Sequence, residues 1–362
     1  MDTQLNSTSL NGSAMPALAV SAATEAKPAQ RILAFDFTKG ILVLFMVLYH
    51  WLNYFVGPQG DFYKYLRFLT PSFIFITGFL ISHVHFRKYG TGSLQLSKRL
   101  LVRGSKLLVV FVLTNLLMGL LIPNSSVRRI FSEGPLADNL YAVFVSGNVA
   151  IAGIGKTASF IILIPIAYLL IVSAGLSALC RFSRYVFPFS FAISLLCVVV
   201  LDELGIHSMN VELLMMGLLG VVCGFATGEM VANLPHYAYA LCSVYVAYLA
   251  AITVWNVPLA LRVFGVVLTT ALIYIAGIGK RDLATLRSRT ILLGQYSLFG
   301  YLSQIAILRI LRRLFFATSF ASVTLPLSLV LALTLTIGLV EVLDRARAKV
   351  RPVDALYRAI FA

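Results

Sequence analysis

The sequence predicts an all-α polytopic membrane protein. Hydrophobic residues make up 59% of the 362-residue chain and charged residues only 12%, whereas a soluble domain carries about 25% charged residues. The mean hydropathy is +0.91. Apolar stretches of roughly 20 residues recur along the chain, which is the length that a helix needs to cross about 30 Å of hydrocarbon. These three observations exclude a soluble protein.

The order of the elements follows from the position of the apolar stretches. Residues 1–30 are rich in Ser, Ala, Asn and Thr, contain no long apolar run, and are expected to form a disordered cytoplasmic tail without a cleaved signal peptide. A domain of about ten transmembrane helices is expected over residues 31–345, followed by a cytoplasmic C-terminal tail over residues 346–362. The expected spans cover roughly residues 34–55, 66–86, 101–122, 158–179, 185–201, 211–231, 236–254, 258–278, 291–311 and 321–343.

The charge distribution predicts the orientation of these spans. The chain has 29 basic and 14 acidic residues, a net charge of +15. In a soluble protein such an excess of basic residues would indicate a nucleic-acid partner. Here most of the basic residues lie in short connections between spans, so we expect no nucleic-acid partner. Four basic connections fall on one side of a ten-span arrangement, at residues 87–106, 181–184, 280–289 and 344–351. By the positive-inside rule that side is cytoplasmic, so both termini are expected in the cytoplasm. The membrane is expected to be a bacterial inner (plasma) membrane.

The four cysteines lie in or at the edges of apolar spans, at positions 180, 197, 223 and 242. Their spacing matches neither a disulfide framework nor a metal site. We therefore expect small packing residues and no bound metal.

The first span contains the strongest candidate for chemistry. Asp36 and Lys39 are three residues apart, so they share a helix face and are close enough to pair. His50 follows eleven residues after Lys39, which corresponds to about 16 Å along the helix axis, towards the outer half of the span. An ionisable side chain inside a membrane helix is costly and marks a functional-site candidate. Imidazole is also the side chain best able to exchange a proton near neutral pH.

The neighbours of His50 determine which side chain can orient it. Asp36 is too far along a straight helix to reach the imidazole, whereas Asn53 or Tyr54, one turn beyond, can orient it. We take Asp36, Asn53 and Tyr54 as supporting residues. The alternative is that His50 is an interfacial histidine at the end of its span, and the sequence leaves both interpretations open.

A basic stripe opens the third span. Arg99, Arg103 and Lys106 are spaced four and three residues apart, so they lie along one face of a helix that enters the membrane from the cytoplasm. Guanidinium groups suit bidentate contacts with phosphate. The alternative is that the stripe anchors the helix on anionic lipid headgroups.

Two further spans carry unusual residues. In the second span, Gly78 follows Thr77 and permits close approach of two helix backbones. The ninth span is polar for a helix that faces lipid, so we expect it to face a cavity or a neighbouring helix. Its polar residues are Gln295, Tyr296, Ser297, Tyr301, Ser303 and Gln304.

The order and spacing of these motifs resemble the membrane acyltransferases of acyltransferase family 3. The residues that carry the resemblance are the run 35–40 followed by His50, the run 77–81, Arg99 with Arg103, and Gly294, Ser297, Leu298, Tyr301 and Leu302. The related glucan-succinylating and heparan-glucosaminide acetyltransferase-like membrane proteins share much of this pattern. The chain differs from it in having Lys39 where relatives have Arg, Thr77 where they have Ser, and Gln304 where they often have His.

The resemblance implies a membrane-bound O-acyltransferase of the cell envelope. The donor would be a cytoplasmic acyl-CoA, above all acetyl-CoA, acting as a cosubstrate with no bound cofactor, and the acceptor a hydroxyl of a carbohydrate or glycolipid. His50 would be the general base, and Lys39, Arg99 and Arg103 would bind the donor. This mechanism requires a water-accessible passage between Lys39 and His50. Membrane lipids are the other expected partners, and an oligomer is compatible with the sequence.

Two other functions agree with the same residues. A transporter of a glycan, lipid or small solute would also place charged groups inside the membrane, although no internal repeat is visible. An inactive relative that assembles with other envelope proteins is the third interpretation, and Lys39 in place of Arg is its best support.

Overall fold

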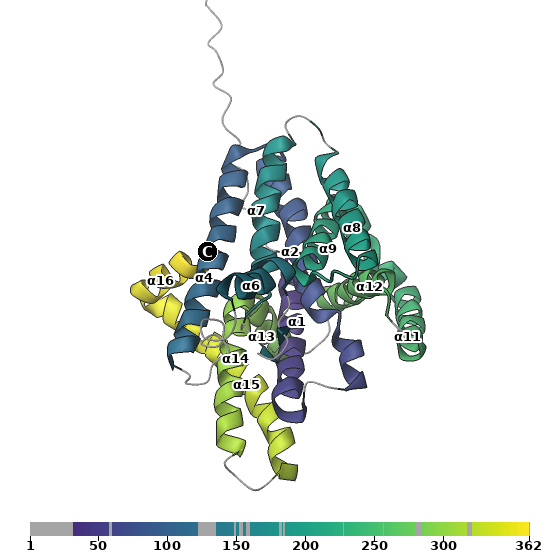
Figure 1. Cartoon of the computed structure of the whole chain (residues 1–362). Coiled ribbons are helices and arrows are strands. Elements are labelled where there is room, and N and C mark those ends of the chain that lie inside the picture. The colour runs from purple at the N-terminus through teal and green to yellow at the C-terminus, as the bar shows by residue number, and fades with distance from the viewer. Residues whose placement is uncertain are drawn as a thin grey trace, which may run out of the picture. The chain divides into compact units, whose positions relative to one another are not determined.

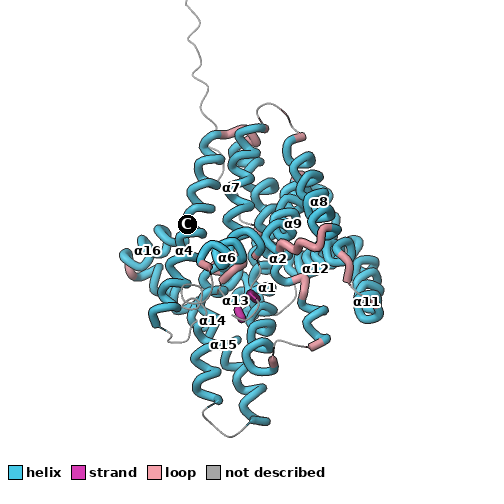
Figure 2. Tube along the Cα trace, in the orientation of Figure 1, coloured by secondary structure: helices cyan, strands magenta, loops and turns pink. Residues whose placement is uncertain are grey.

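The computed structural model describes residues 32–57, 60–121, 135–147, 150–151, 155–156, 160–180, 183, 185–226, 228–255, 257–279, 284–316 and 321–361. Residues 32–362 form one compact unit. The predicted N-terminal tail lies outside the described residues. Helices make up nearly all of the described chain (Figure 2), which confirms the predicted all-α class.

The elements follow one another as shown in Figure 1. The first half contains α1 (Leu33–Trp51), η1 (Leu52–Val56), η2 (Asp61–Leu66), α2 (Leu69–Leu80), η3 (Ile81–Phe86), α3 (Arg87–Tyr89), α4 (Leu94–Leu121), α6 (Leu136–Tyr141), η4 (Ala142–Ser146) and α7 (Leu163–Leu179). The second half contains α8 (Val186–Glu203), α9 (Met209–Gly224), α10 (Gly228–Asn233), η5 (Leu234–Tyr237), α11 (Ala238–Val254), α12 (Leu259–Ile278), α13 (Ala284–Gln295), α14 (Ser297–Phe316), α15 (Ala321–Lys349) and α16 (Arg351–Phe361). Two-residue strands, β1 (Ala150–Ile151) and β2 (Gly155–Lys156), pair antiparallel before α7.

Seven helices within the described ranges are long and apolar enough to cross a membrane. They are residues 33–56, 61–89, 94–120, 186–203, 228–254, 259–278 and 325–349. The number becomes eight if α13 and α14, which meet at an angle of 94°, count as one broken span. The predicted fourth and sixth spans correspond to α7 and α9, which have 17 and 16 residues and are shorter than the roughly 20 residues that usually cross a bilayer.

Glycines allow α2 and α9 to lie in direct backbone contact. A Cβ on Gly220 would collide with the backbone of Phe75, and a Cβ on Gly224 would collide with the backbone of Phe79. Since both residue numbers increase together, the two helices run parallel. Gly78 of α2 meets the backbone of α9 in the same way, which confirms the close approach predicted for it.

Helix α1 is the central element of the bundle, in contact with α2, α12, α13, α14 and α15. It meets α13 at two glycines. A Cβ on Gly40 would collide with the carbonyl group of Thr290, and a Cβ on Gly294 would collide with the carbonyl group of Asp36. This contact holds α13 against the start of α1, and α14 then follows after the sharp turn at Tyr296.

The predicted C-terminal tail is helical where it is described. Helix α15 extends to Lys349, and α16 follows directly. Arg347 donates hydrogen bonds from Nε and Nη2 to Oδ1 of Asp354, at 2.9 and 2.7 Å. The guanidinium group of Arg347 also lies 3.9 Å from the ring centroid of Tyr357. These contacts attach α16 to the end of α15.

Candidate functional site

Asp36 and Lys39 form the ion pair that their spacing predicts. The distance from Lys39 Nζ to Asp36 Oδ1 is 2.7 Å, and the two side chains are 22% and 5% exposed. The attraction between the two charges offsets part of the cost of taking a carboxylate out of water. An ammonium group carries three donors, so Lys39 can bind a second acceptor while it is paired.

His50 lies half-buried in the last turn of α1 with aromatic rings around it. Its ring centroid is 5.4 Å from that of Tyr49 and 6.2 Å from that of Tyr301 in α14. The ring of Tyr301 lies in turn 6.0 Å from the ring of Phe160, in an edge-to-face arrangement. The imidazole is therefore placed within the bundle, at the interface between α1 and α14.

The two residues predicted to orient His50 make other hydrogen bonds. Asn53 donates from Nδ2 to the carbonyl oxygen of Tyr49, at 3.0 Å. The hydroxyl of Tyr54 accepts a hydrogen bond from Nε of Arg309, also at 3.0 Å. Their role as orienting residues for His50 stays a prediction.

Arg309 is a candidate that the sequence analysis missed. It lies in the middle of α14, and besides its bond to Tyr54 its Nη1 is 3.7 Å from the sulfur of Met118. An arginine inside a membrane helix marks a functional candidate by the rule already applied to His50. The residue stands inside the predicted ninth span, 291–311, so the signal was present in the sequence.

Gln304 is fully buried in α14, and neither its amide oxygen nor its amide nitrogen has a hydrogen-bond partner among the residues that the structure describes. It shares a helix face with Tyr301 and Leu308, three residues before it and four after it. Tyr301 lies near His50, and Leu308 packs in one cluster with Val47 of α1. The unpaired amide therefore belongs to the face of α14 that packs against α1.

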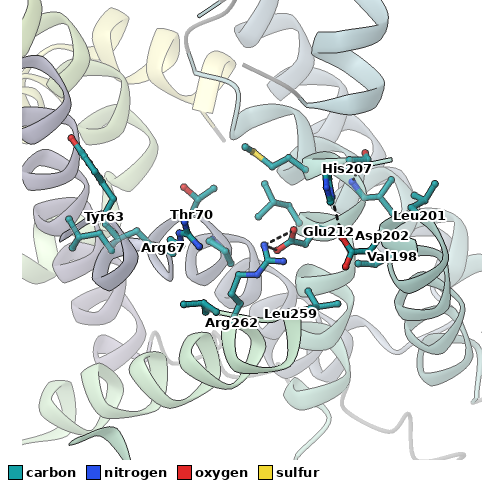
Figure 3. A pocket seen from close by; sticks show the side chains of 18 of the residues that line it. Tyr63, Arg67, Thr70, Val198, Leu201, Asp202, His207, Glu212, Leu259 and Arg262 are labelled. Atoms are coloured by element: carbon teal, nitrogen blue, oxygen red, sulfur yellow. Dashed lines mark hydrogen bonds and ion pairs between the residues drawn. The ribbon is translucent and has the colours of Figure 1, made fainter. Parts of the chain in front are cut away.

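A pocket of about 790 Å³ lies at the end of α1 that carries His50 (Figure 3). Tyr49 and Asn53, on either side of His50 in the chain, are among its lining residues. The other walls come from η2, the starts of α2, α9 and α12, and the end of α8. Their polar and charged members are Tyr63, Arg67, Thr70, Asp202, His207, Ser208, Glu212 and Arg262.

An ion pair and a histidine–carboxylate contact lie on the wall of this pocket (Figure 3). Nη1 of Arg262 donates to both carboxylate oxygens of Glu212, at 2.7 and 2.9 Å. Nδ1 of His207 lies 3.1 Å from Oδ1 of Asp202, and this second pair is largely exposed. Arg262 and Glu212 are both partly buried, and this pair joins α12 to α9 on the pocket wall.

The basic stripe of α4 lines a second hollow of about 480 Å³. Arg99 and Arg103 are both exposed there, together with Lys98. Arg99 donates a hydrogen bond to the hydroxyl of Tyr89, and its guanidinium carbon lies 4.8 Å from the centroid of that ring. The stacking on Tyr89 fixes the position of Arg99, whereas the exposed Arg103 is accessible to a ligand.

The predicted site residues are distributed between these places. Arg99 and Arg103 line the second hollow and Asn53 lines the first pocket, whereas Lys39 and His50 line neither of the two. The passage expected between Lys39 and His50 stays a prediction. No protein-family model, no curated protein and no solved structure matches the chain.

Proposed function

We propose that the chain is an integral-membrane O-acyltransferase, which moves an acyl group from acyl-CoA to a hydroxyl of a carbohydrate or lipid-linked glycan. The observation that carries the proposal is the position of His50 in the bundle, between two chain neighbours that line a large polar pocket. Tyrosine rings, amides and carboxylates, all present on that wall, are side chains that suit a ligand rich in hydroxyl groups. The resemblance of the motifs to acyltransferase family 3 gives the donor and acceptor classes.

The basic hollow and the pocket belong to opposite ends of one candidate span. The pocket includes Thr70 near the start of α2, and the hollow includes His85 near the end of the same segment. Fifteen helical residues separate them, which corresponds to about 22 Å. Donor and acceptor would therefore approach from different sides of the membrane.

The proposed topology has ten spans with both termini in the cytoplasm, in the plasma membrane of a bacterium. It counts α7 and α9 as short spans and the bent pair α13–α14 as one broken span. The positive-inside rule then assigns the hollow of Arg99 and Arg103 to the cytoplasmic side, where acyl-CoA is made. The pocket near His50 opens on the other side.

The chemistry assigns one role to each charged group. Arg99 and Arg103 bind donor phosphates, and Lys39 binds the donor with the ammonium hydrogens that Asp36 leaves free. His50 takes the proton from the acceptor hydroxyl as its oxygen attacks the thioester carbonyl. The new O–C bond forms, the C–S bond breaks, and the departing thiolate of CoA takes the proton back from His50.

The test is release of free thiol from acetyl-CoA by the full-length protein in liposomes. We expect thiol release that depends on an added glycan or glycolipid fraction, and transfer of the acetyl label to that fraction. Absence of thiol release and of label transfer across acetyl-, propionyl- and succinyl-CoA would contradict the proposal.

A transporter is the second candidate, and the break between α13 and α14 favours it. Discontinuous membrane helices are typical of transporter binding sites near the middle of the bilayer. The angle of 94° at Tyr296 is a break of that kind. Flux of a labelled glycan or solute in proteoliposomes, without any acyl transfer, would support this function over the first.

A further inference from the structure

Arg67 is a cation on the pocket wall that has no ion-pair or hydrogen-bond partner among the described residues. It lies in the turn between η2 and α2, its side chain is exposed, and it lines the pocket of about 790 Å³. Within the described part of the chain, no carboxylate, carbonyl or hydroxyl group pairs with it. Figure 3 shows Arg67 near Thr70 on one side of the pocket, with the pair of Arg262 and Glu212 at its centre.

The two carboxylates of the pocket each contact another side chain. Arg262 holds both oxygens of Glu212, and His207 contacts Asp202. Neither carboxylate pairs with Arg67. The positive charge of Arg67 therefore remains available to a ligand.

A second basic residue of the same segment, Lys64, can be compared with Arg67. In the proposed topology both lie on the outer side of the membrane. Lys64, one turn earlier, has partners within the fold. Its ammonium group donates to the carbonyl oxygen of Thr253 at 3.3 Å and lies 5.4 Å from the ring centroid of Tyr65. Arg67 has no such contact, which makes Lys64 a matched control.

We propose that this pocket binds a ligand that carries a phosphate or carboxylate group, and that Arg67 pairs with that anion. A guanidinium group offers the planar pair of donors that fits either anion. Tyr49 and Tyr63, with ring centroids 5.6 Å apart, provide an aromatic wall for the uncharged part of the ligand.

The anion has two chemical sources. One is the headgroup phosphate of a lipid in the outer leaflet. The other is an acidic or phosphate-linked glycan. In that case the inference rests on the proposed function, and the glycan is the class of acceptor that the acyltransferase would modify. Binding of the anion itself does not depend on acyl transfer.

The test compares thermal unfolding of the purified protein in dodecyl maltoside with sodium phosphate and with sodium chloride at equal ionic strength. A ligand that binds only the folded state raises the melting temperature. We expect phosphate to raise it in the wild type and in Lys64→Gln, and Arg67→Gln to weaken phosphate binding about tenfold. Because Arg67 makes no ion pair or hydrogen bond within the described part of the chain, the variant should melt like the wild type in chloride. Equal melting of the wild type in both salts, or a phosphate effect that survives in Arg67→Gln, would overturn the inference.

Two additions to the same assay identify the source. If the anion belongs to a lipid, phosphatidylglycerol added to the micelles should remove the phosphate effect. If it belongs to a glycan, glucose 1-phosphate should bind more tightly than phosphate, and glucose should not replace it. His50→Asn should bind phosphate like the wild type. A chain that binds phosphate through Arg67 but never transfers an acyl group would disprove the proposed function and leave this inference standing.

Discussion

The ring of His50 lies 6.2 Å from the ring of Tyr301, across the interface of α1 and α14. The same interface contains the hydrogen bond from Arg309 to Tyr54 and the unpaired amide of Gln304. Polar groups concentrated between two apolar helices are costly for a membrane protein. We infer that this interface, which continues into the polar pocket at Tyr49 and Asn53, is where the function resides.

The ion pair of Asp36 and Lys39 should stabilise the fold only as a pair. Asp36→Asn or Lys39→Met alone should each destabilise the protein by about 2 to 3 kcal/mol, since each leaves a charge in a poorly hydrated site. The double variant should lose less than the sum of the two. Unfolding in detergent measures all three, and additive losses would show that the two charges do not interact.

The contact of α1 with α13 depends on Gly294. Gly294→Ala places a methyl group against the carbonyl group of Asp36, so we expect a loss of about 1 to 3 kcal/mol. Gly338→Ala in α15 is the matched control, because its Cβ would meet nothing within 4 Å. That control should melt at or above the wild-type temperature. Equal melting of the two variants would argue against the close contact.

Substitution of Gln304 should affect the stability of the fold and the rate of acyl transfer in different directions. Gln304→Met keeps the volume and removes two buried polar atoms that have no hydrogen-bond partner within the described ranges. Such a change should leave stability unchanged or raise it by about 1 kcal/mol. If the amide serves the reaction at His50, the same variant should transfer acyl groups more slowly. A variant that is less stable than the wild type would show that the amide is satisfied in the fold.

Attachment of α16 should depend on pH. Hydrogen bonds from Arg347 are the largest of the effects that lower the pKa of Asp354 below its ordinary value of 3.8, and Arg358 adds to them. A lowered pKa in the folded state stabilises the folded form above that ordinary value, and this contribution disappears as the pH falls through the folded-state pKa. Protection of the α16 amides, measured as their exchange rate relative to the intrinsic rate at the same pH, should therefore be strong at pH 7 and be lost only in strong acid.

Asp354→Asn should show the fast exchange of α16 already at pH 7. Arg351→Gln, at the first residue of the same helix, is the control and should exchange like the wild type. Slow exchange in Asp354→Asn would mean that the apolar contacts of Tyr357 and Phe361 are sufficient to hold α16.

Several features followed from the sequence because they depend on local spacing. Composition alone required membrane helices, the three-residue spacing of Asp36 and Lys39 predicted their pair, and Gly78 predicted a close helix contact. Arg309 was equally accessible, since it stands inside a predicted span. The spacing of Val353, Tyr357, Ile360 and Phe361 is also helical, although the segment was expected to be a tail.

The pocket and the broken helix could not be predicted in the same way. The pocket is formed by residues from four separate stretches of the chain, 49–53, 63–71, 198–213 and 257–262, so no single segment carries its signature. Gly294, two residues before the turn at Tyr296, contacts the backbone of α1 at Asp36, some 250 residues earlier in the chain. Contacts at such separation depend on the packing of the whole bundle.

The most direct test of the central claim is acetyl transfer by proteoliposomes that contain the wild type or His50→Asn. Acetyl-CoA with a labelled acetyl group is supplied together with the glycan and glycolipid fraction, and label in that fraction is counted. We expect transfer by the wild type and a loss of about a hundredfold or more in His50→Asn, with equal melting temperatures for the two proteins. Equal transfer by both proteins would contradict the assignment of His50 as the general base.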